Sequence, residues 1–226
     1  MQLAGNLLIV GDSFCATQSG WPAHLHAQLD SGRTAQFRCQ GFPGGSWWKI
    51  KQYIDGCNYY ESEFMKQLEY AVIIHPHIHR PIQSATEWFP PAIPLPRHYD
   101  NKTIPEDQLA ISLYYKYIDN PDFQIWAFQK WAEEVETLFA SHVKLVHLVT
   151  SRQALSLLPA MRGQVVTTLL NDLAAAQYAN GVFTGVDTIP DPANHFSPEN
   201  NIVFAEEMHR VISAGATQIN IDRFKL

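Results

Sequence analysis

The fold is decided by the stretch Leu7–Phe14, which reads LLIVGDSF. Four consecutive aliphatic residues predict a strand that is buried on both faces, as central strands of parallel sheets are. The run stops abruptly at Gly-Asp-Ser, which predicts a loop at the carboxyl end of this strand. Ligands of open α/β sheets bind outside the carboxyl ends of the strands, so the loop presents Ser13 where a nucleophile is useful.

Strand and helix patterns alternate along the rest of the chain. The expected strands cover 7–10, 36–39, 70–74, 143–150 and 165–170, and the expected helices cover 21–29, 47–54, 61–68, 103–117, 121–139, 172–179 and 198–214. Gly56 is expected to interrupt the second helix. The alternation predicts a three-layer α/β/α sandwich with about five parallel strands, as one domain over 1–226.

A proline-rich excursion at about 80–103 interrupts this alternation. Five prolines there exclude a regular helix or central strand, and they surround Trp88 and Phe89. Two interpretations stay open at this point. The segment either walls an acyl or sugar pocket near Ser13, or it packs on the body of the domain or on a second subunit.

The amino-acid composition argues against several classes of binding partner. The net charge of −6 and the pI of about 5.9 give no general attraction to nucleic acid. The three cysteines match no metal spacing, and reduced thiols suit a cytoplasmic location. We find no signal-peptide pattern and no apolar run of bilayer length, so we expect no membrane insertion. The sequence does not indicate an oligomeric state.

The residues supply the parts of a nucleophilic site. A serine hydroxyl is a weak nucleophile until a base takes its proton, and a carboxylate orients that base. Ser13 follows the first strand, and His195 follows an acidic stretch near the other end of the chain. The glycine-rich loop 41–46 after the second strand is either a flexible turn or an oxyanion donor, because glycine lets a backbone N–H approach a reacting group.

These blocks resemble, in type and order, those of the SGNH or GDSL-type hydrolases, a family of esterases and lipases. Gly11–Ser13 matches the first block of the family, Gly41–Gly44 matches the Gly-x-x-Gly of the second, and His195–Asn201 matches the fifth. The resemblance spans nearly the whole chain, and it implies a flavodoxin-like arrangement of the sheet and helices. Gly-Asp-Ser alone is a weak signal, whereas the three blocks together are a strong one.

The resemblance implies a function and a set of site residues. It makes Ser13 the nucleophile and His195 the general base, and it makes the backbone N–H groups of Ser13 and Gly44 oxyanion donors. The implied reaction is hydrolysis of a carboxylic ester through an acyl-enzyme, with an O-acetyl or short-chain acyl ester on a small molecule or glycan as substrate. We expect no cofactor and no metal.

The third block departs from the family. The family has Gly-x-Asn-Asp, whose asparagine side chain is a third oxyanion donor, whereas this chain has His75–Ile78. By register His77 takes the place of the asparagine. A neutral imidazole can donate one N–H, so His77 either substitutes for the asparagine or is a packed or solvated histidine. An uncompensated loss of one donor costs about 3–4 kcal/mol, or about 10²–10³ in rate, and predicts a slow enzyme.

The acidic partner of His195 is also displaced. The family has Asp-x-x-His, but Pro192 lies three residues before His195 and Asp191 lies four before it. We assign Asp191 as the residue that orients His195, with Asp187 as the second choice. If neither carboxylate reaches the imidazole, a backbone carbonyl orients it and activity drops.

Three other hypotheses follow from the same sequence. The altered third block and displaced aspartate also fit a non-catalytic protein that binds glycans or serves a structural role on this scaffold, because a fold does not guarantee a function. The run His75-x-His77-x-His79 suggests a zinc hydrolase as another hypothesis. Alternate residues of an extended segment share a face, so the three imidazoles could converge on one Zn²⁺ ion. Cys15 is a weak candidate nucleophile, and burial in the core is the simpler interpretation.

Aromatic residues near these loops complete the predicted site. We expect Asp12, Trp47 and Trp88 to contact the substrate of the hydrolase. In the glycan-binding alternative, Trp48 joins Trp47 and Trp88 as a stacking surface.

Overall fold

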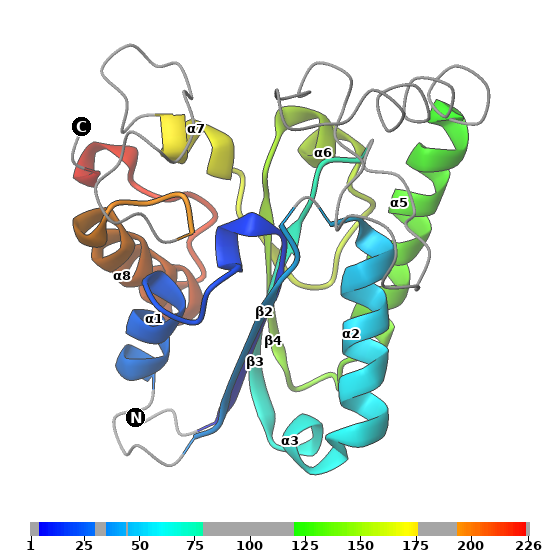
Figure 1. Ribbon diagram of the computed structural model, residues 1–226, viewed down its shortest axis with the longest axis horizontal. Helices are drawn as coiled ribbons and strands as arrows, with labels where there is room; N and C mark the ends of the chain where they lie inside the picture. The colour runs from blue at the N-terminus through cyan, green and yellow to red at the C-terminus, as the bar shows by residue number, and fades with distance from the viewer. Residues whose placement is uncertain (1–4, 30–34, 44, 79–119, 176–193, 225–226) are drawn as a thin grey trace, which may run out of the picture.

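The computed structural model describes residues 5–29, 35–43, 45–78, 120–175 and 194–224. Its centre is a sheet that lies between two groups of helices (Figure 1). The sheet is parallel and has five strands in the order β2-β1-β3-β4-β5. The strands are β1 (Asn6–Gly11), β2 (Phe37–Gly41), β3 (Leu68–His75), β4 (Lys144–Val149) and β5 (Gln164–Val165). This is the flavodoxin-like order, whose topological switch point lies between β1 and β3.

Helices cover both faces of the sheet, which confirms the predicted three layers (Figure 1). One face carries α1 (Trp21–Leu29), α7 (Leu170–Ala175) and α8 (Pro198–Ala214). The other face carries α2 (Trp47–Tyr60), α3 (Ser62–Lys66), α5 (Pro121–Thr137) and α6 (Arg152–Leu157). Two short 3-10 turns, η1 (Ser13–Cys15) and η4 (Ile221–Arg223), complete the described elements.

The first strand is buried on both faces, as its unbroken aliphatic run predicts. Leu7 and Ile9 pack toward α1 and α8, whereas Leu8 and Val10 pack toward α2 and α5. All four side chains are 0% exposed. Because β1 lies between β2 and β3, its carboxyl end opens at the switch point of the sheet.

Two of the predicted boundaries are wrong. Helix α2 continues through Gly56 to Tyr60. The packing of its apolar face outweighs the roughly 1 kcal/mol cost of a helical glycine. The strand predicted over 165–170 is limited to β5, since the Thr167 N–H donates to the carbonyl of Thr217, beyond α8, and α7 begins at Leu170.

Other boundaries shift less. The helix predicted over 61–68 ends at Lys66, because β3 already begins at Leu68. Helix α6 has no counterpart among the predicted elements. The proline-rich excursion and the helix predicted over 103–117 lie outside the described residues.

Candidate active site

The turn after β1 is fixed by Asp12. The Phe14 N–H donates to Oδ1 of Asp12 at 3.1 Å, and the Cys15 N–H donates to the carbonyl of Asp12 at 3.2 Å. Asp12 is 1% exposed and Phe14 is 4% exposed, whereas Ser13 between them is partly exposed. The turn therefore buries its two flanking side chains and leaves Ser13 at the surface.

The end of β2 packs directly against this turn. A Cβ on Gly41 would lie 2.5 Å from the carbonyl oxygen of Asp12 and 2.5 Å from the backbone of Ala16. Only glycine permits this approach. The Phe42 N–H also donates to the carbonyl of Gly11 at 3.0 Å, so the second predicted block begins beside Ser13.

The loop that carries His195 has an unusual backbone. Asn194 and His195 have φ angles of 54° and 67°, in the left-handed region that non-glycine residues rarely adopt. Such conformations cost about 1–3 kcal/mol each and persist where surrounding contacts enforce them, often at functional sites. Asn194 supplies these contacts: it accepts from the Thr17 N–H at 2.9 Å and donates to the carbonyl of Ser19 at 3.0 Å.

Phe14 connects the turn after β1 with the loop that carries His195, which lies far away in the sequence. Its ring centroid lies 4.6 Å from that of His195 and 5.9 Å from that of Phe196. Nε1 of Trp21 donates to the carbonyl of Phe14 at 2.7 Å, and the Trp21 N–H donates to Oδ1 of Asn201 at 2.8 Å. These contacts hold the His195 loop against the turn that presents Ser13.

Helix α8 begins immediately after this loop. The Asn200 N–H donates to Oγ of Ser197 at 3.2 Å, and Pro198 occupies the first turn, as the sequence pattern predicts. Nδ2 of Asn201 donates to the carbonyl of Phe196 at 2.9 Å. Nδ1 of His195 is buried, whereas the residue as a whole is partly exposed.

The remaining predicted site residues fall into three groups. Asp12 is buried and caps η1, and Trp47 is 3% exposed and packs in the core against Phe128. His77 follows the end of β3 and is partly buried. Four predicted residues lie outside the described residues: Gly44, Trp88, Asp187 and Asp191.

Of the histidine run, the structure describes His75 and His77. His75 is 0% exposed and faces α2 and α5, with its Nε2 2.9 Å from Nδ1 of His147. His79 lies outside the described residues, and among those residues no group of three His, Cys, Asp or Glu is placed to hold a metal ion. Cys15 is 0% exposed, and burial and a hydrogen bond with Cys39 raise its thiol pKa, which favours packing over nucleophilic attack.

Sequence reasoning missed the asparagines that join the two ends of the chain. Asn194 tolerates left-handed backbone better than most residues and directly precedes His195, so its position was an available signal. Asn201 lies one turn into α8 and gives no comparable signal, because its partner Trp21 is 180 residues away.

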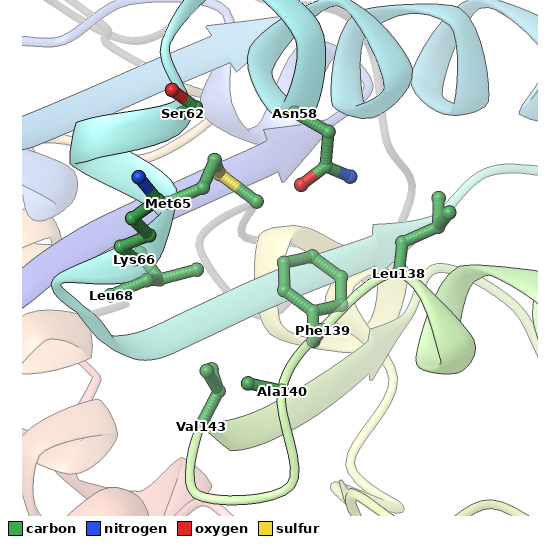
Figure 2. Close-up of a pocket in the computed structure, with 9 residues that line it drawn as sticks. All are labelled: Asn58, Ser62, Met65, Lys66, Leu68, Leu138, Phe139, Ala140 and Val143. Atoms are coloured by element: carbon green, nitrogen blue, oxygen red, sulfur yellow. The ribbon is translucent and has the colours of Figure 1, made fainter.

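Two cavities at the opposite end of the sheet do not compete with this site. The one in Figure 2 has a volume of about 270 Å³ and lies near the start of β3 and β4. Its walls include Met65, Leu68, Phe139 and Val143, and among the described residues that line it Lys66 is the one ionisable group. A second, of about 440 Å³, lies along the start of β4, beside β5. In the described part of the chain, the residues that line these cavities include neither Ser13 nor His195.

Comparison of this chain with protein-family models, with curated proteins and with solved structures gives no match. Within the described residues, no helix is both long and apolar enough to cross a membrane.

Proposed function

We propose that this protein is a serine ester hydrolase of the SGNH or GDSL type that acts on an O-acetyl or other short-chain acyl ester. The observation that carries the proposal is the 4.6 Å contact between the rings of Phe14 and His195. Phe14 directly follows Ser13. The contact therefore brings the loop that carries His195 against the turn that carries Ser13. The junction lies at the carboxyl ends of β1 and β2, where open α/β sheets bind ligands.

In the proposed reaction His195 removes the proton of Ser13 as Oγ forms a bond to the ester carbonyl carbon. Backbone N–H groups of Ser13 and Gly44, with the imidazole of His77 as third donor, stabilise the oxyanion. His195 then passes the proton to the leaving alkoxide as its bond to the acyl carbon breaks. In the second half His195 removes a proton from water as the water oxygen bonds to the acyl carbon, and returns that proton to Oγ of Ser13 as the acyl–serine bond breaks. Asp191 orients His195, with Asp187 as the alternative.

The decisive experiment combines a fluorophosphonate probe with hydrolysis of p-nitrophenyl acetate. We expect the purified protein to be labelled and to turn over, and Ser13→Ala to lose the label and at least about 10³-fold in kcat. Ser62→Ala is the matched control, because Ser62 is an exposed serine at the start of α3, at the far end of the sheet. Labelling of Ser13→Ala at the level of the wild type would refute the assignment.

A glycan-binding protein without hydrolase activity is the second candidate. Phe123 and Trp126, in the first turns of α5, are 46% and 55% exposed with ring centroids 5.8 Å apart. Exposed aromatic faces of this kind suit stacking on a sugar. The same experiment separates the two candidates, because a binding protein neither reacts with the probe nor hydrolyses the ester.

A further inference from the structure

A buried chain of three ionisable side chains lies on the α2 and α5 side of the sheet, and the proposed hydrolysis does not use it. Nε2 of His75 lies 2.9 Å from Nδ1 of His147, and Nε2 of His147 lies 3.0 Å from Oε1 of Glu136. Both imidazoles are 0% exposed. The series runs from the carboxyl end of β3 across β4 to α5.

The backbone fixes Glu136 as the anionic end of this chain. The Gly163 N–H donates to Oε1 and the Arg162 N–H donates to Oε2, each at 2.6 Å. Burial opposes ionisation of Glu136, but hydrogen bonds from His147 and from these two backbone groups outweigh it and lower its pKa to about 2. A Cβ on Gly163 would lie 2.6 Å from Nε2 of His147, so glycine lets the backbone close over the imidazole.

The ionised carboxylate determines the proton positions along the chain. Glu136 can only accept, so Nε2 of His147 carries a proton, and in neutral His147 the Nδ1 atom is therefore an acceptor. Nε2 of His75 then donates to it. This arrangement leaves Nδ1 of His75 as a lone-pair nitrogen, and that buried atom has no hydrogen-bond partner in the described part of the chain.

The described neighbours of His75 include two aromatic rings. The ring of His75 contacts Trp47 of α2 at 4.8 Å and Phe128 of α5 at 5.9 Å between centroids. Among the described residues, His147 is the one titratable group bonded to His75, and Glu136 is the one carboxylate bonded to His147. The guanidinium of Arg162 donates to the carbonyls of Ala140 and Glu136 at the end of α5.

We propose that Glu136, His147 and His75 form a proton relay that takes up one proton as a unit. A solvent acid delivers a proton to Nδ1 of His75, where a new N–H bond forms. The Nε2–H bond of His75 breaks as its proton moves along the hydrogen bond to Nδ1 of His147. No electrons are transferred: His75 stays neutral in its other tautomer, and the positive charge rests on His147.

The location of the charge follows from the electrostatics. Burial, and then the neighbouring His147, lower the pKa of His75, so a cation on His75 itself is disfavoured. A cation on His147 would instead have Nε2 3.0 Å from Oε1 of the Glu136 carboxylate, so the two opposite charges would attract each other. Protonation at one end of the relay therefore places the charge at the other.

An NMR titration of the unmodified protein tests the relay without reference to hydrolysis. The ¹⁵N shifts of both rings are followed from about pH 8 down to the onset of acid unfolding. We expect His75 to change from the Nε2–H to the Nδ1–H tautomer at the same midpoint at which His147 becomes cationic. A His75 that keeps its Nε2–H tautomer throughout, or two rings with separate midpoints, would overturn the proposal.

A variant pair identifies the counter-charge. Glu136→Gln removes the carboxylate, and we expect the shared midpoint to fall by at least about one pH unit, a tenfold loss of proton affinity. Glu134→Gln is the control, because Glu134 lies on the same helix but pairs with Lys51. An unchanged midpoint in Glu136→Gln would contradict the relay; if that variant does not fold, the titration of the unmodified protein decides alone.

Discussion

The side chain of Asn194 and the backbone of Thr17 are joined by two hydrogen bonds that run in opposite directions. The Thr17 N–H donates to Oδ1 of Asn194 at 2.9 Å, and Nδ2 of Asn194 donates to the carbonyl of Thr17 at 3.2 Å. The side chain thus acts like a short piece of paired strand between the loops that carry the two proposed catalytic groups. Because Asn194 directly precedes His195, these bonds determine where the imidazole lies.

Asn194→Gly tests this clamp, since glycine keeps the left-handed backbone and removes the side-chain bonds. We expect a loss of about 1–3 kcal/mol in the free energy of unfolding and at least a tenfold fall in kcat for p-nitrophenyl acetate. Thermal unfolding and ester hydrolysis measure the two effects. The control is Gln18→Ala, an exposed change in the loop beyond Ser13; equal effects in both variants would contradict the clamp.

Gly41→Ala addresses the close approach of β2 to the Ser13 turn. The added methyl would meet backbone atoms of Asp12 and Ala16 at 2.5 Å, so we expect a destabilisation of about 1–3 kcal/mol. Chemical denaturation measures it. The matched control is Gly56→Ala, which meets no atom within 4 Å in α2 and is expected to stabilise by about 0.5–1 kcal/mol. A neutral Gly41→Ala would show that the turn can shift at little cost.

His77 is tested by two substitutions with opposite expectations. Removal of a third oxyanion donor in His77→Ala is expected to lower kcat by about 10²–10³. His77→Asn restores the donor type of the SGNH family and is expected to keep at least a tenth of the wild-type rate, a margin of about 1.4 kcal/mol. If His77→Ala hydrolyses the ester as fast as the wild type, the oxyanion site has only two donors.

Enzyme kinetics can decide whether Asp191 or Asp187 orients His195. We expect Asp191→Asn to lower kcat by up to about 10⁴, because a neutral partner leaves His195 in the wrong tautomer, and Asp187→Asn to lower it less than tenfold. Ester hydrolysis by both variants, with circular dichroism to confirm folding, gives the comparison. A larger loss in Asp187→Asn reverses the assignment.

The histidine relay predicts acid sensitivity of the fold. The pKa of His75 is lowered by burial and by His147, so below the ordinary value of 6.5 the unfolded chain binds more protons and the stability falls. Glu136, whose pKa is lowered to about 2, adds a further loss as the pH falls from 4.5 toward that value. Thermal unfolding across this range should show both losses, and Glu136→Gln should remove the second. A melting temperature independent of pH would contradict both.

The sequence predicts the layers because each strand carries its own local signal. The aliphatic run of β1 and the capping pattern before α8 depend on neighbouring residues alone, and both appear in the structure. The limits of β5 do not depend on neighbouring residues alone. The N–H of Thr167 bonds to the carbonyl of Thr217, and this pairing depends on where α8 ends. Likewise α2 passes Gly56 because tertiary packing outweighs local propensity.

The side-chain chemistry was only partly predictable for the same reason. The approach of His75 to His147 depends on the register of β3 against β4, in which Ile73 pairs with His147 and His75 with Val149. Spacing along the chain contains no information on that register. The resemblance to SGNH hydrolases instead supplied Ser13 and His195 through local motifs, and the structure places their loops together through Asn194 and Phe14.

The bond between Trp21 and Asn201 joins residues 180 positions apart. At about 5–20 residues per second, a ribosome needs roughly 10–40 s to add that length of chain. During this interval a nascent chain already contains the turn that carries Ser13 but lacks the loop that carries His195, its proposed base. In the proposed mechanism, esterase activity therefore starts only when α8 docks.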